Sequence, residues 1–362
     1  MINIIKSDIT SKKRVLNAFN RIRTDRVPIN YMANISVHNK LAKHLGISNS
    51  LDTVMDYLGV DFKELMPQYI GKKIFADIPG RKVDPLWGHV TRWIGNNFGG
   101  YWDYCDFPLI GKSEEEIANW PIPNADDFDY NELLERCKQH KDKAIHLGNP
   151  GLSDIINSVG MLRNMENILL DLALGTPGVL HYIDRRINFQ AKLVERVLDR
   201  CGKYISFIWI GEDLGTQTSP LISLSMFRKQ IRPRHQRVID VAKKYNKPVM
   251  IHSCGSSSWV FDDFYEMGIS MVDTLQPEAK NMDPEYLINN FGDKLSFHGG
   301  ISTARLVDLT EQEVREEVTY VINTMKKYNG YCLAPTHAIQ DNTPVENIVA
   351  MYETAHVRGM YQ

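Results

Sequence analysis

The strongest constraint on the fold is a repeated alternation of short apolar runs with longer amphipathic runs. The short runs predict strands at 25–31, 60–65, 144–147, 205–210, 248–252, 271–275, 295–298 and 331–334. The amphipathic runs between them, and the one after the last at 345–360, have the length and the apolar face of helices. This alternation predicts an α/β fold of the (β/α)8 TIM barrel type rather than an open, doubly wound sheet.

A segment between the second and third predicted strands interrupts the alternation. Residues 71–107 combine several aromatic side chains, Phe98 among them, with Pro-Gly and Gly-Gly turn pairs. This composition predicts an inserted β-meander. We expect its aromatic side chains to pack on the barrel, and the alternative is that they roof a pocket. Residues 1–362 are interpreted as one barrel domain that contains this insertion.

The charge balance and the cysteine count exclude several classes of protein. There are 42 Lys and Arg against 44 Asp and Glu, and no basic stripe that would follow a nucleic acid backbone. The chain has no apolar run of about 18 residues and no signal peptide at its N-terminus, so we expect a soluble, cytoplasmic protein without a membrane partner. Five cysteines at irregular spacing do not form a disulfide framework, which agrees with a reducing compartment.

The fifth predicted strand ends in a pair of metal-ligating residue types, His252 and Cys254. Side chains two apart on a strand lie on the same side, so one cation can contact both. Cys332, in the eighth predicted strand, is the best third ligand in the sequence. His, Cys and Cys with one open position are typical of catalytic zinc, and the carboxyl ends of barrel strands carry the chemistry.

Two adjacent acids, Glu212 and Asp213, follow the fourth predicted strand. One of them is expected to have a catalytic role in the pocket, and the alternative is a capping or loop-stabilising role. Glu278 or Glu212 is a candidate for a further zinc ligand, and the sequence does not choose between them. The remaining candidates are polar residues near strand ends that we expect to bind substrate: Tyr31, Asn34, Gln217, His298 and His337. For His298, a hydrogen-bonded role inside the barrel is the alternative.

Three motifs together resemble a known family. His252-Ser253-Cys254-Gly255, Gly330-Tyr331-Cys332 and the stretch 341–347 are similar to the zinc methyltransferase branch of the uroporphyrinogen decarboxylase superfamily, and Gly211 to Gln217 is similar to many of its bacterial members. The resemblance covers residue 25 to the C-terminus and is strongest after residue 205. It implies an α/β barrel in which His252, Cys254 and Cys332 hold Zn²⁺. It also implies that zinc binds a small thiol as thiolate, while a corrinoid protein partner carries the methyl group.

Two alternatives belong to other classes of function. A porphyrinogen decarboxylase is disfavoured because the stretch 27–34 has no arginine for the carboxylates of that substrate. Decarboxylation also has no need of His252, Cys254 and Cys332. A noncatalytic barrel with structural zinc is disfavoured because such sites usually have four protein ligands, often in close pairs. The sequence therefore favours methyl transfer, and it does not identify the donor, the acceptor or the direction.

Overall fold

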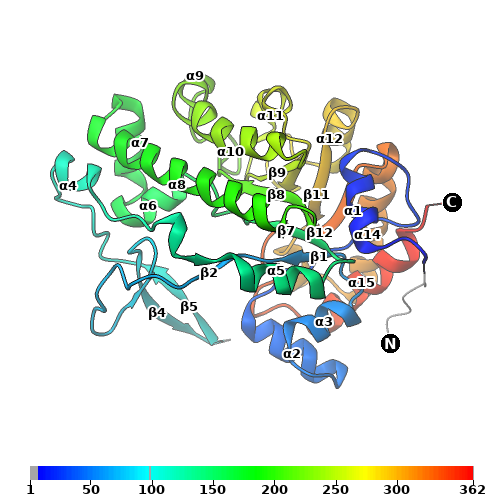
Figure 1. The fold of residues 1–362 in the computed structure, drawn as a ribbon. Helices are drawn as coiled ribbons and strands as arrows, with labels where there is room; N and C mark the ends of the chain where they lie inside the picture. Colours follow the sequence, from blue (N-terminus) through cyan, green and yellow to red (C-terminus); the bar gives the residue numbers. More distant parts are fainter. Residues whose placement is uncertain (1–6, 98, 362) are drawn as a thin grey trace.

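A computed structural model describes residues 7–97 and 99–361. Its main element is a sheet of parallel strands (Figure 1). The sheet has seven strands in the order β1-β7-β8-β9-β10-β11-β12, and every neighbouring pair is parallel. Their bounds are β1 Phe62–Glu64, β7 Ala144–Leu147, β8 Ile205–Gly211, β9 Val249–His252, β10 Met271–Thr274, β11 Ser296–Ile301 and β12 Tyr331–Pro335. Within each of the six strands β7 to β12, every residue is buried, as expected for a parallel sheet covered on both faces.

The two edges of this sheet are connected by the segment predicted as the first strand. The N–H of Leu333 in β12 donates to Pro28 O at 2.8 Å, and Asn30 N–H donates to Leu333 O at 2.9 Å. On the other side, Asp61 N–H, next to β1, donates to Ile29 O at 2.9 Å. The sheet is therefore curled, in an arrangement compatible with the predicted (β/α)8 barrel, although residues 28–30 make only isolated bridges and no regular strand.

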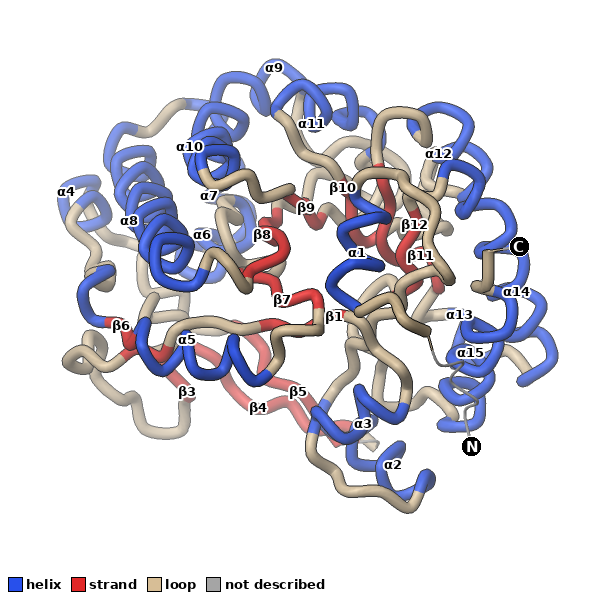
Figure 2. The backbone as a smooth tube through the Cα atoms, turned by 45° about the vertical axis from the view of Figure 1, so that its right-hand side comes forward, coloured by secondary structure: helices blue, strands red, loops and turns tan. Residues whose placement is uncertain are grey.

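Helices lie outside the curled sheet (Figure 2). The α-helices are α1 Ser11–Phe19, α2 Ile35–Leu45, α3 Leu51–Tyr57, α4 Glu114–Ala118, α5 Tyr130–Gln139, α6 Ile156–Arg163, α7 Met165–Leu174, α8 Pro177–Cys201, α9 Leu224–Met226, α10 Arg232–Lys244, α11 Phe261–Met267, α12 Pro284–Phe291, α13 Arg305–Asp308, α14 Glu311–Met325 and α15 Val345–Arg358. Short 3₁₀ turns lie at 125–127, 258–260 and 326–328. No helix of the described chain is long and apolar enough to cross a membrane.

One predicted helix, 223–245, is divided into three parts. Between α9 and α10 the residues Phe227–Ile231 form a π-helical turn. Pro233 lies at the start of α10 and has no backbone N–H, so it cannot continue a regular α-helical hydrogen-bond series from the preceding turn. The division is therefore explained by one residue whose effect the amphipathic pattern does not show.

A buried ionic network ties the N-terminal helix to the start of the sheet. Asp61 is fully buried and accepts hydrogen bonds from Arg14 at 2.6 Å, Arg26 at 2.7 Å and Ser11 Oγ at 2.7 Å, and from the N–H of Ile29 at 2.9 Å. Although burial opposes ionisation, the two arginines hold the pKa of Asp61 below its usual range. This network closes the end of the barrel opposite to the site described below.

The interrupting segment contains a small antiparallel sheet. Its strands are β3 Lys82–Val83, β4 Val90–Asn96 and β5 Gly99–Tyr104, and they lie apart from the parallel sheet (Figure 1). A separate antiparallel pair joins β2 Gln68–Tyr69, which precedes this segment in the chain, to β6 Phe128–Asp129, which follows it. Trp93 and Trp102 are exposed, so these two aromatic side chains do not pack on the barrel as expected. Phe98 lies outside the described residues.

Candidate metal centre

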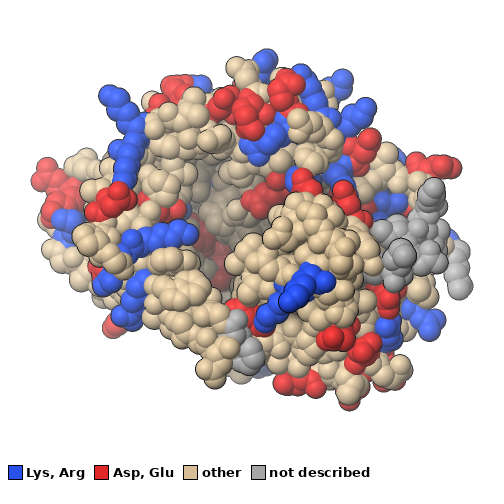
Figure 3. All heavy atoms as spheres, turned by 90° about the horizontal axis from the view of Figure 1, so that it is seen from below, with Lys and Arg blue, Asp and Glu red and all other residues tan. Residues whose placement is uncertain are grey.

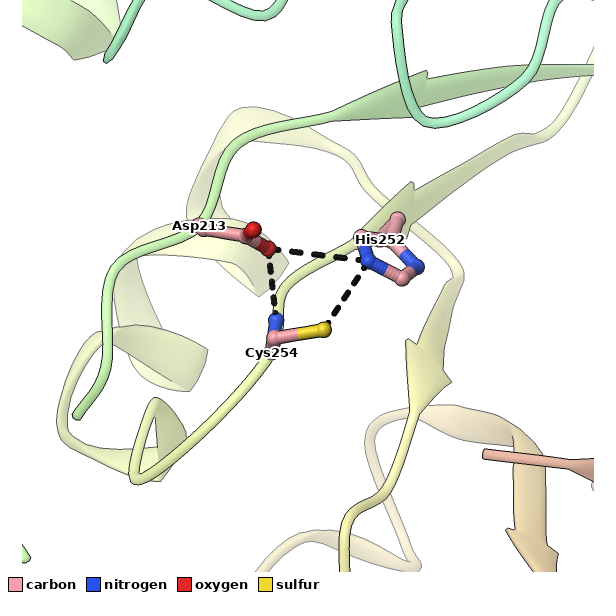
Figure 4. A group of neighbouring side chains, drawn as sticks. All are labelled: Asp213, His252 and Cys254. Carbon is pink, nitrogen blue, oxygen red and sulfur yellow. Dashed lines mark hydrogen bonds and ion pairs between the residues drawn. The ribbon is translucent and has the colours of Figure 1, made fainter. Parts of the chain in front are cut away.

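Three potential metal ligands meet at the carboxyl ends of two neighbouring strands. His252 is the last residue of β9, Cys254 follows two residues later, and Asp213 lies two residues past β8, whose Gly211 is in register with His252. Their ligand atoms all lie within 4.8 Å of one another (Figure 4). His252 Nε2 is 3.2 Å from Cys254 Sγ and 3.5 Å from Asp213 Oδ1. The third potential ligand beside the predicted pair His252 and Cys254 is therefore the carboxylate of Asp213.

The loops after β8 and β9 are in backbone contact, which places Asp213 beside Cys254. A Cβ on Gly255 would lie 2.4 Å from Gly215 O, and the φ of Gly255 is +70°. Only glycine fits this contact without a shift of the backbone. Asp213 Oδ1 accepts the N–H of Cys254 at 2.9 Å, and its Oδ2 accepts Asn157 Nδ2 at 2.7 Å. The carboxylate is thus oriented by the loop after β9 and by the first turn of α6 Ile156–Arg163.

His252 is oriented by a second carboxylate, Asp273 in β10. Asp273 Oδ2 lies 2.6 Å from His252 Nδ1 and can only accept, so Nδ1 carries the proton and Nε2 presents its lone pair to the centre. The other oxygen of Asp273 accepts His298 Nδ1, and Asn30 Nδ2 donates to His298 Nε2 at 3.1 Å. This chain of hydrogen bonds fixes the tautomer and the direction of the ring, as carboxylates behind histidine ligands do at zinc sites.

The electrostatics of the centre favour a cation. Burial opposes a charged imidazole, but Cys254 and Asp273 together raise the pKa of His252 well above its ordinary value. Asp273 stays ionised despite its burial, because His298 and His252 lower its pKa to about 2. A thiolate, a carboxylate and a neutral imidazole balance a divalent charge and leave one position open, so this donor set fits catalytic Zn²⁺.

The centre opens into a cavity of about 590 Å³. Side chains from three regions line it: the inserted segment (Leu86, Trp87, His89, Tyr104), the loop and helix after β7 (Asp154, Asn157, Ser158) and one face of α8 (Arg186, Phe189, Gln190, Leu193). His337, from the loop after β12, also lines it. One face of the molecule is deeply hollowed, with acidic side chains visible in the hollow (Figure 3). The cavity is large enough for a small molecule beside the metal centre.

The two acids after β8 have different surroundings. Glu212 is buried and accepts the N–H of Ile155 at 3.0 Å and of Ile156 at 2.8 Å, at the start of α6, and its Oε2 lies 2.9 Å from His235 Nε2. Burial raises the pKa of Glu212 to about 8. Glu212 therefore matches the loop-stabilising alternative although it borders the cavity, whereas Asp213 lies in the metal centre.

Cys332 is not part of this centre, which corrects the predicted ligand set. Cys332 is the second residue of β12, fully buried and in register with His298, so it lies near the amino end of its strand. His252, in contrast, ends its strand. Burial raises the pKa of the Cys332 thiol well above its ordinary value, which disfavours the thiolate that a metal needs. The residue that the loop after β12 brings to the cavity is His337.

Cys332→Ser is expected to retain zinc at the wild-type stoichiometry, because the side chain does not border the metal centre. Metal analysis of the purified variant by mass spectrometry checks this, with circular dichroism to show that the variant is folded. Loss of zinc from a folded Cys332→Ser protein would restore Cys332 as a ligand.

The other predicted site residues are distributed over the barrel. Glu278 is exposed in the loop after β10 and belongs neither to the metal centre nor to the cavity wall, which corrects its assignment as a ligand. His298 is fully buried in the hydrogen-bond chain behind His252, as its structural alternative proposed. Tyr31, Asn34 and Gln217 do not line the cavity: Tyr31 is buried, Asn34 precedes α2, and Gln217 is exposed.

Sequence reasoning missed several residues that the structure places at the site. Asp273 could have been identified from the sequence, since a buried acid inside a predicted apolar strand needs a partner. Asp154 is buried, its Oδ1 has no hydrogen-bond partner, and burial with the nearby Glu212 raises its pKa to about 8. Arg186 had no signal, because nothing in an amphipathic helix distinguishes one arginine from another.

Asp273→Asn is expected to weaken zinc binding by about 10- to 100-fold, because an amide cannot accept from both His252 and His298. Competition with a zinc chelator measures this affinity. Asp263→Asn is the matched control: this acid is also buried, but it pairs with Arg228 and Arg232 outside the cavity. Equal affinities of the wild type and Asp273→Asn would contradict the orienting role.

Known proteins resemble this chain in part of its sequence and in its fold. Residues 191–358 match the family model described as uroporphyrinogen decarboxylase (URO-D), which confirms the predicted resemblance to that superfamily over these residues. A methyltransferase from Methanosarcina mazei has a similar fold, with a TM-score of 0.64 at 15% sequence identity, over 96% of this chain and 98% of that one.

Other comparisons give less. A fructose-bisphosphate aldolase from Plasmodium falciparum reaches a TM-score of only 0.34 at 12% identity, over 99% of this chain and 98% of that one, and carries no argument. No curated protein sequence matches this chain.

Proposed function

We propose that this chain, whose residues 191–358 carry the uroporphyrinogen decarboxylase family match, is a zinc-dependent methyltransferase that moves a methyl group between a corrinoid protein and a small thiol. The observation that carries the proposal is the group of Asp213, His252 and Cys254 at the carboxyl ends of β8 and β9, facing the cavity. The fold shared with the Methanosarcina methyltransferase supports it.

The donor set is suited to activating a thiol. When bound, zinc would lower the pKa of a substrate thiol and hold it as a thiolate. Asp213 and Cys254 already neutralise a divalent charge, so a further thiolate would make the centre net anionic and keep its sulfur electron-rich. Asp273 orients His252 by accepting the proton on Nδ1, so that Nε2 faces the centre. These residues thus favour a nucleophilic sulfur at neutral pH.

Methyl transfer from a corrinoid requires no oxidant or reductant. The new sulfur–carbon bond forms as the carbon–cobalt bond breaks, and the bonding pair stays on cobalt. Sulfur, carbon and cobalt must lie in a line, so the corrinoid has to approach the cavity from solvent on a partner protein. Decarboxylation of a porphyrinogen is less well supported, because Arg186 is the only arginine among the described residues that line the cavity and that substrate carries many carboxylates.

The test combines zinc-loaded protein with methylcobalamin or a methylated corrinoid protein and a small thiol. The expected products are a thioether and demethylated cobalt, visible as a change in the corrinoid spectrum. Turnover of uroporphyrinogen without methyl transfer to any thiol would contradict the proposal.

A matched pair of amides separates the roles of the two acids after β8. Asp213→Asn is expected to lower methyl transfer and zinc affinity at least about 10-fold, because it removes an anionic donor from the centre. Glu212→Gln is expected to lower thermal stability, because its amide would place N–H groups opposite the N–H groups of Ile155 and Ile156, and to retain zinc. Chelator competition and thermal unfolding measure the two effects. Equal zinc affinity of Asp213→Asn and the wild type would remove Asp213 from the ligand set.

A further inference from the structure

Arg186 is a buried arginine without an anionic partner. It lies on α8 with 2% of its surface exposed, and its Nε and Nη1 atoms make no hydrogen bond. No carboxylate among the described residues forms an ion pair with it. Its guanidinium instead lies over the ring of Trp87, 3.6 Å from the ring centre. A buried charge and unsatisfied N–H groups both destabilise a folded protein, so this arrangement needs an explanation.

Within the described part of the chain, the other buried arginines all have partners. Arg14 and Arg26 share Asp61, and Arg234 pairs with Asp184. Even Arg185, the neighbour of Arg186 in the chain, donates to the carbonyl oxygens of Ala118 and Trp120. Arg186 alone among these is buried and unpaired, which indicates that its partner is not part of the chain.

The unpaired guanidinium belongs to the wall of the cavity. Arg186, Phe189, Gln190 and Leu193 are spaced as one face of α8, and this face lines the cavity together with Trp87 of the inserted segment. Trp87 is itself held in place, since its carbonyl oxygen accepts Trp120 Nε1 at 3.1 Å. The guanidinium therefore lies on a ring whose backbone is already anchored, and such preorganisation favours tight and selective binding.

The carboxylates near Arg186 do not pair with it: Asp84 acts on His89 instead, and burial raises the pKa of the cavity-lining Asp154 to about 8. His89 also lines the cavity, and its Nε2 lies 3.1 Å from the carbonyl oxygen of Ser158. Burial and the charge of Arg186 lower the pKa of His89 to about 4, so this ring is neutral at pH 7. Leu86, Met66 and Phe128 complete an apolar environment on the cavity wall. In such surroundings a guanidinium binds an oxyanion far more strongly than it does in water.

We propose that Arg186 forms a carboxylate-binding subsite in the same cavity as the metal centre, so that the molecule bound there carries a carboxylate. This assignment deepens the proposed function: if that function holds, the methyl acceptor is a small thiol acid, with its sulfur at the metal centre and its carboxylate on Arg186. Arg186 and the three residues of the metal centre line the same cavity of about 590 Å³.

The experiment measures binding before activity. Mercaptopropionate, mercaptopropionamide and propionate are titrated into the zinc-loaded protein by calorimetry, and the same probes are applied to Arg186→Met. Mercaptopropionate and propionate are expected to bind the wild type. Arg186→Met is expected to lower the affinity for both acids roughly 10- to 100-fold, because one charge-assisted hydrogen-bonded contact is lost. The neutral amide is expected to bind both proteins equally.

Two further variants serve as controls. Arg196→Met removes an arginine of the same helix that pairs with Asp126 at the surface, outside the cavity wall, and should bind the acids like the wild type. Arg186→Lys keeps the charge and should bind them more tightly than Arg186→Met. Because Arg186 is unpaired in the folded protein, Arg186→Met should unfold at the wild-type temperature or above it.

The outcomes separate this inference from the proposed function. Propionate binding that depends on Arg186 supports the subsite whether or not methyl transfer is observed. If methyl transfer occurs, Arg186→Met should raise the KM for mercaptopropionate and not that for mercaptopropionamide. Acids that bind no better than the amide, or equally to the wild type and Arg186→Met, would overturn the subsite and leave the metal centre untouched.

Discussion

His252→Ala is expected to lose bound zinc and to reduce methyl transfer by at least about 100-fold. Mutation of a residue that only orients a metal ligand typically costs about 10- to 100-fold in metal affinity or activity, and loss of the ligand itself should cost more. His252 is the residue on which the centre depends, since its Nε2 lies close to both Cys254 and Asp213 while Asp273 holds its Nδ1. The barrel should remain folded, because the parallel sheet and its hydrogen bonds do not involve the metal. Metal analysis, corrinoid spectroscopy and circular dichroism measure the three properties.

His44→Ala is the control for this variant, because the His44 side chain is exposed on α2 and lies outside the cavity wall. It should retain zinc and full activity. A folded His252→Ala protein that still binds zinc at the wild-type stoichiometry would show that the metal is held elsewhere.

Asp61→Asn is expected to lower the free energy of unfolding by about 3–5 kcal/mol, the typical cost of leaving buried charge uncompensated. The carboxylate of Asp61 is shared by Arg14 and Arg26, and all three side chains are buried. An amide leaves both arginines without their anion. Chemical denaturation followed by fluorescence measures the difference.

Asp52→Asn is the matched control, since Asp52 pairs with Lys63 at the surface, where an ion pair contributes about 1 kcal/mol or less. The effect of Asp61 should also depend on pH. Its pKa is lowered in the folded protein, so its contribution is present above the unfolded value of about 4 and is lost as the pH falls toward the folded value. A difference between wild type and Asp61→Asn that does not shrink on acidification would contradict this account.

Strands with long apolar runs were the easiest elements to predict from sequence. The predicted strand 205–210 is β8 Ile205–Gly211, because a strand buried on both faces needs a mostly apolar run. The predicted strand 271–275 is β10 Met271–Thr274, although Asp273 interrupts its apolar run. The segment 25–31 was harder, since its hydrogen bonds to Leu333 and Asp61 depend on strands far away in the chain.

The candidate site was predictable only where its ligands are close in sequence. The spacing of His252 and Cys254 follows from strand periodicity alone. The third ligand depends on which end of a distant strand faces the cavity, and the sequence does not show this. Cys332 lies near the amino end of β12, away from the cavity. Asp213 was recognised as a pocket acid, but its contact with Cys254 depends on the packing of Gly215 against Gly255. The missing partner of Arg186 is visible only in three dimensions.

The atoms that hold zinc, and the binding of a thiol to the centre, can be tested in one measurement. X-ray absorption at the zinc edge counts sulfur ligands directly, before and after a small thiol is added to the purified protein. We expect a single sulfur, from Cys254, among nitrogen and oxygen ligands from His252 and Asp213, and a second sulfur once thiol is present. Two sulfurs before thiol is added, or an unchanged sulfur count afterwards, would contradict this expectation.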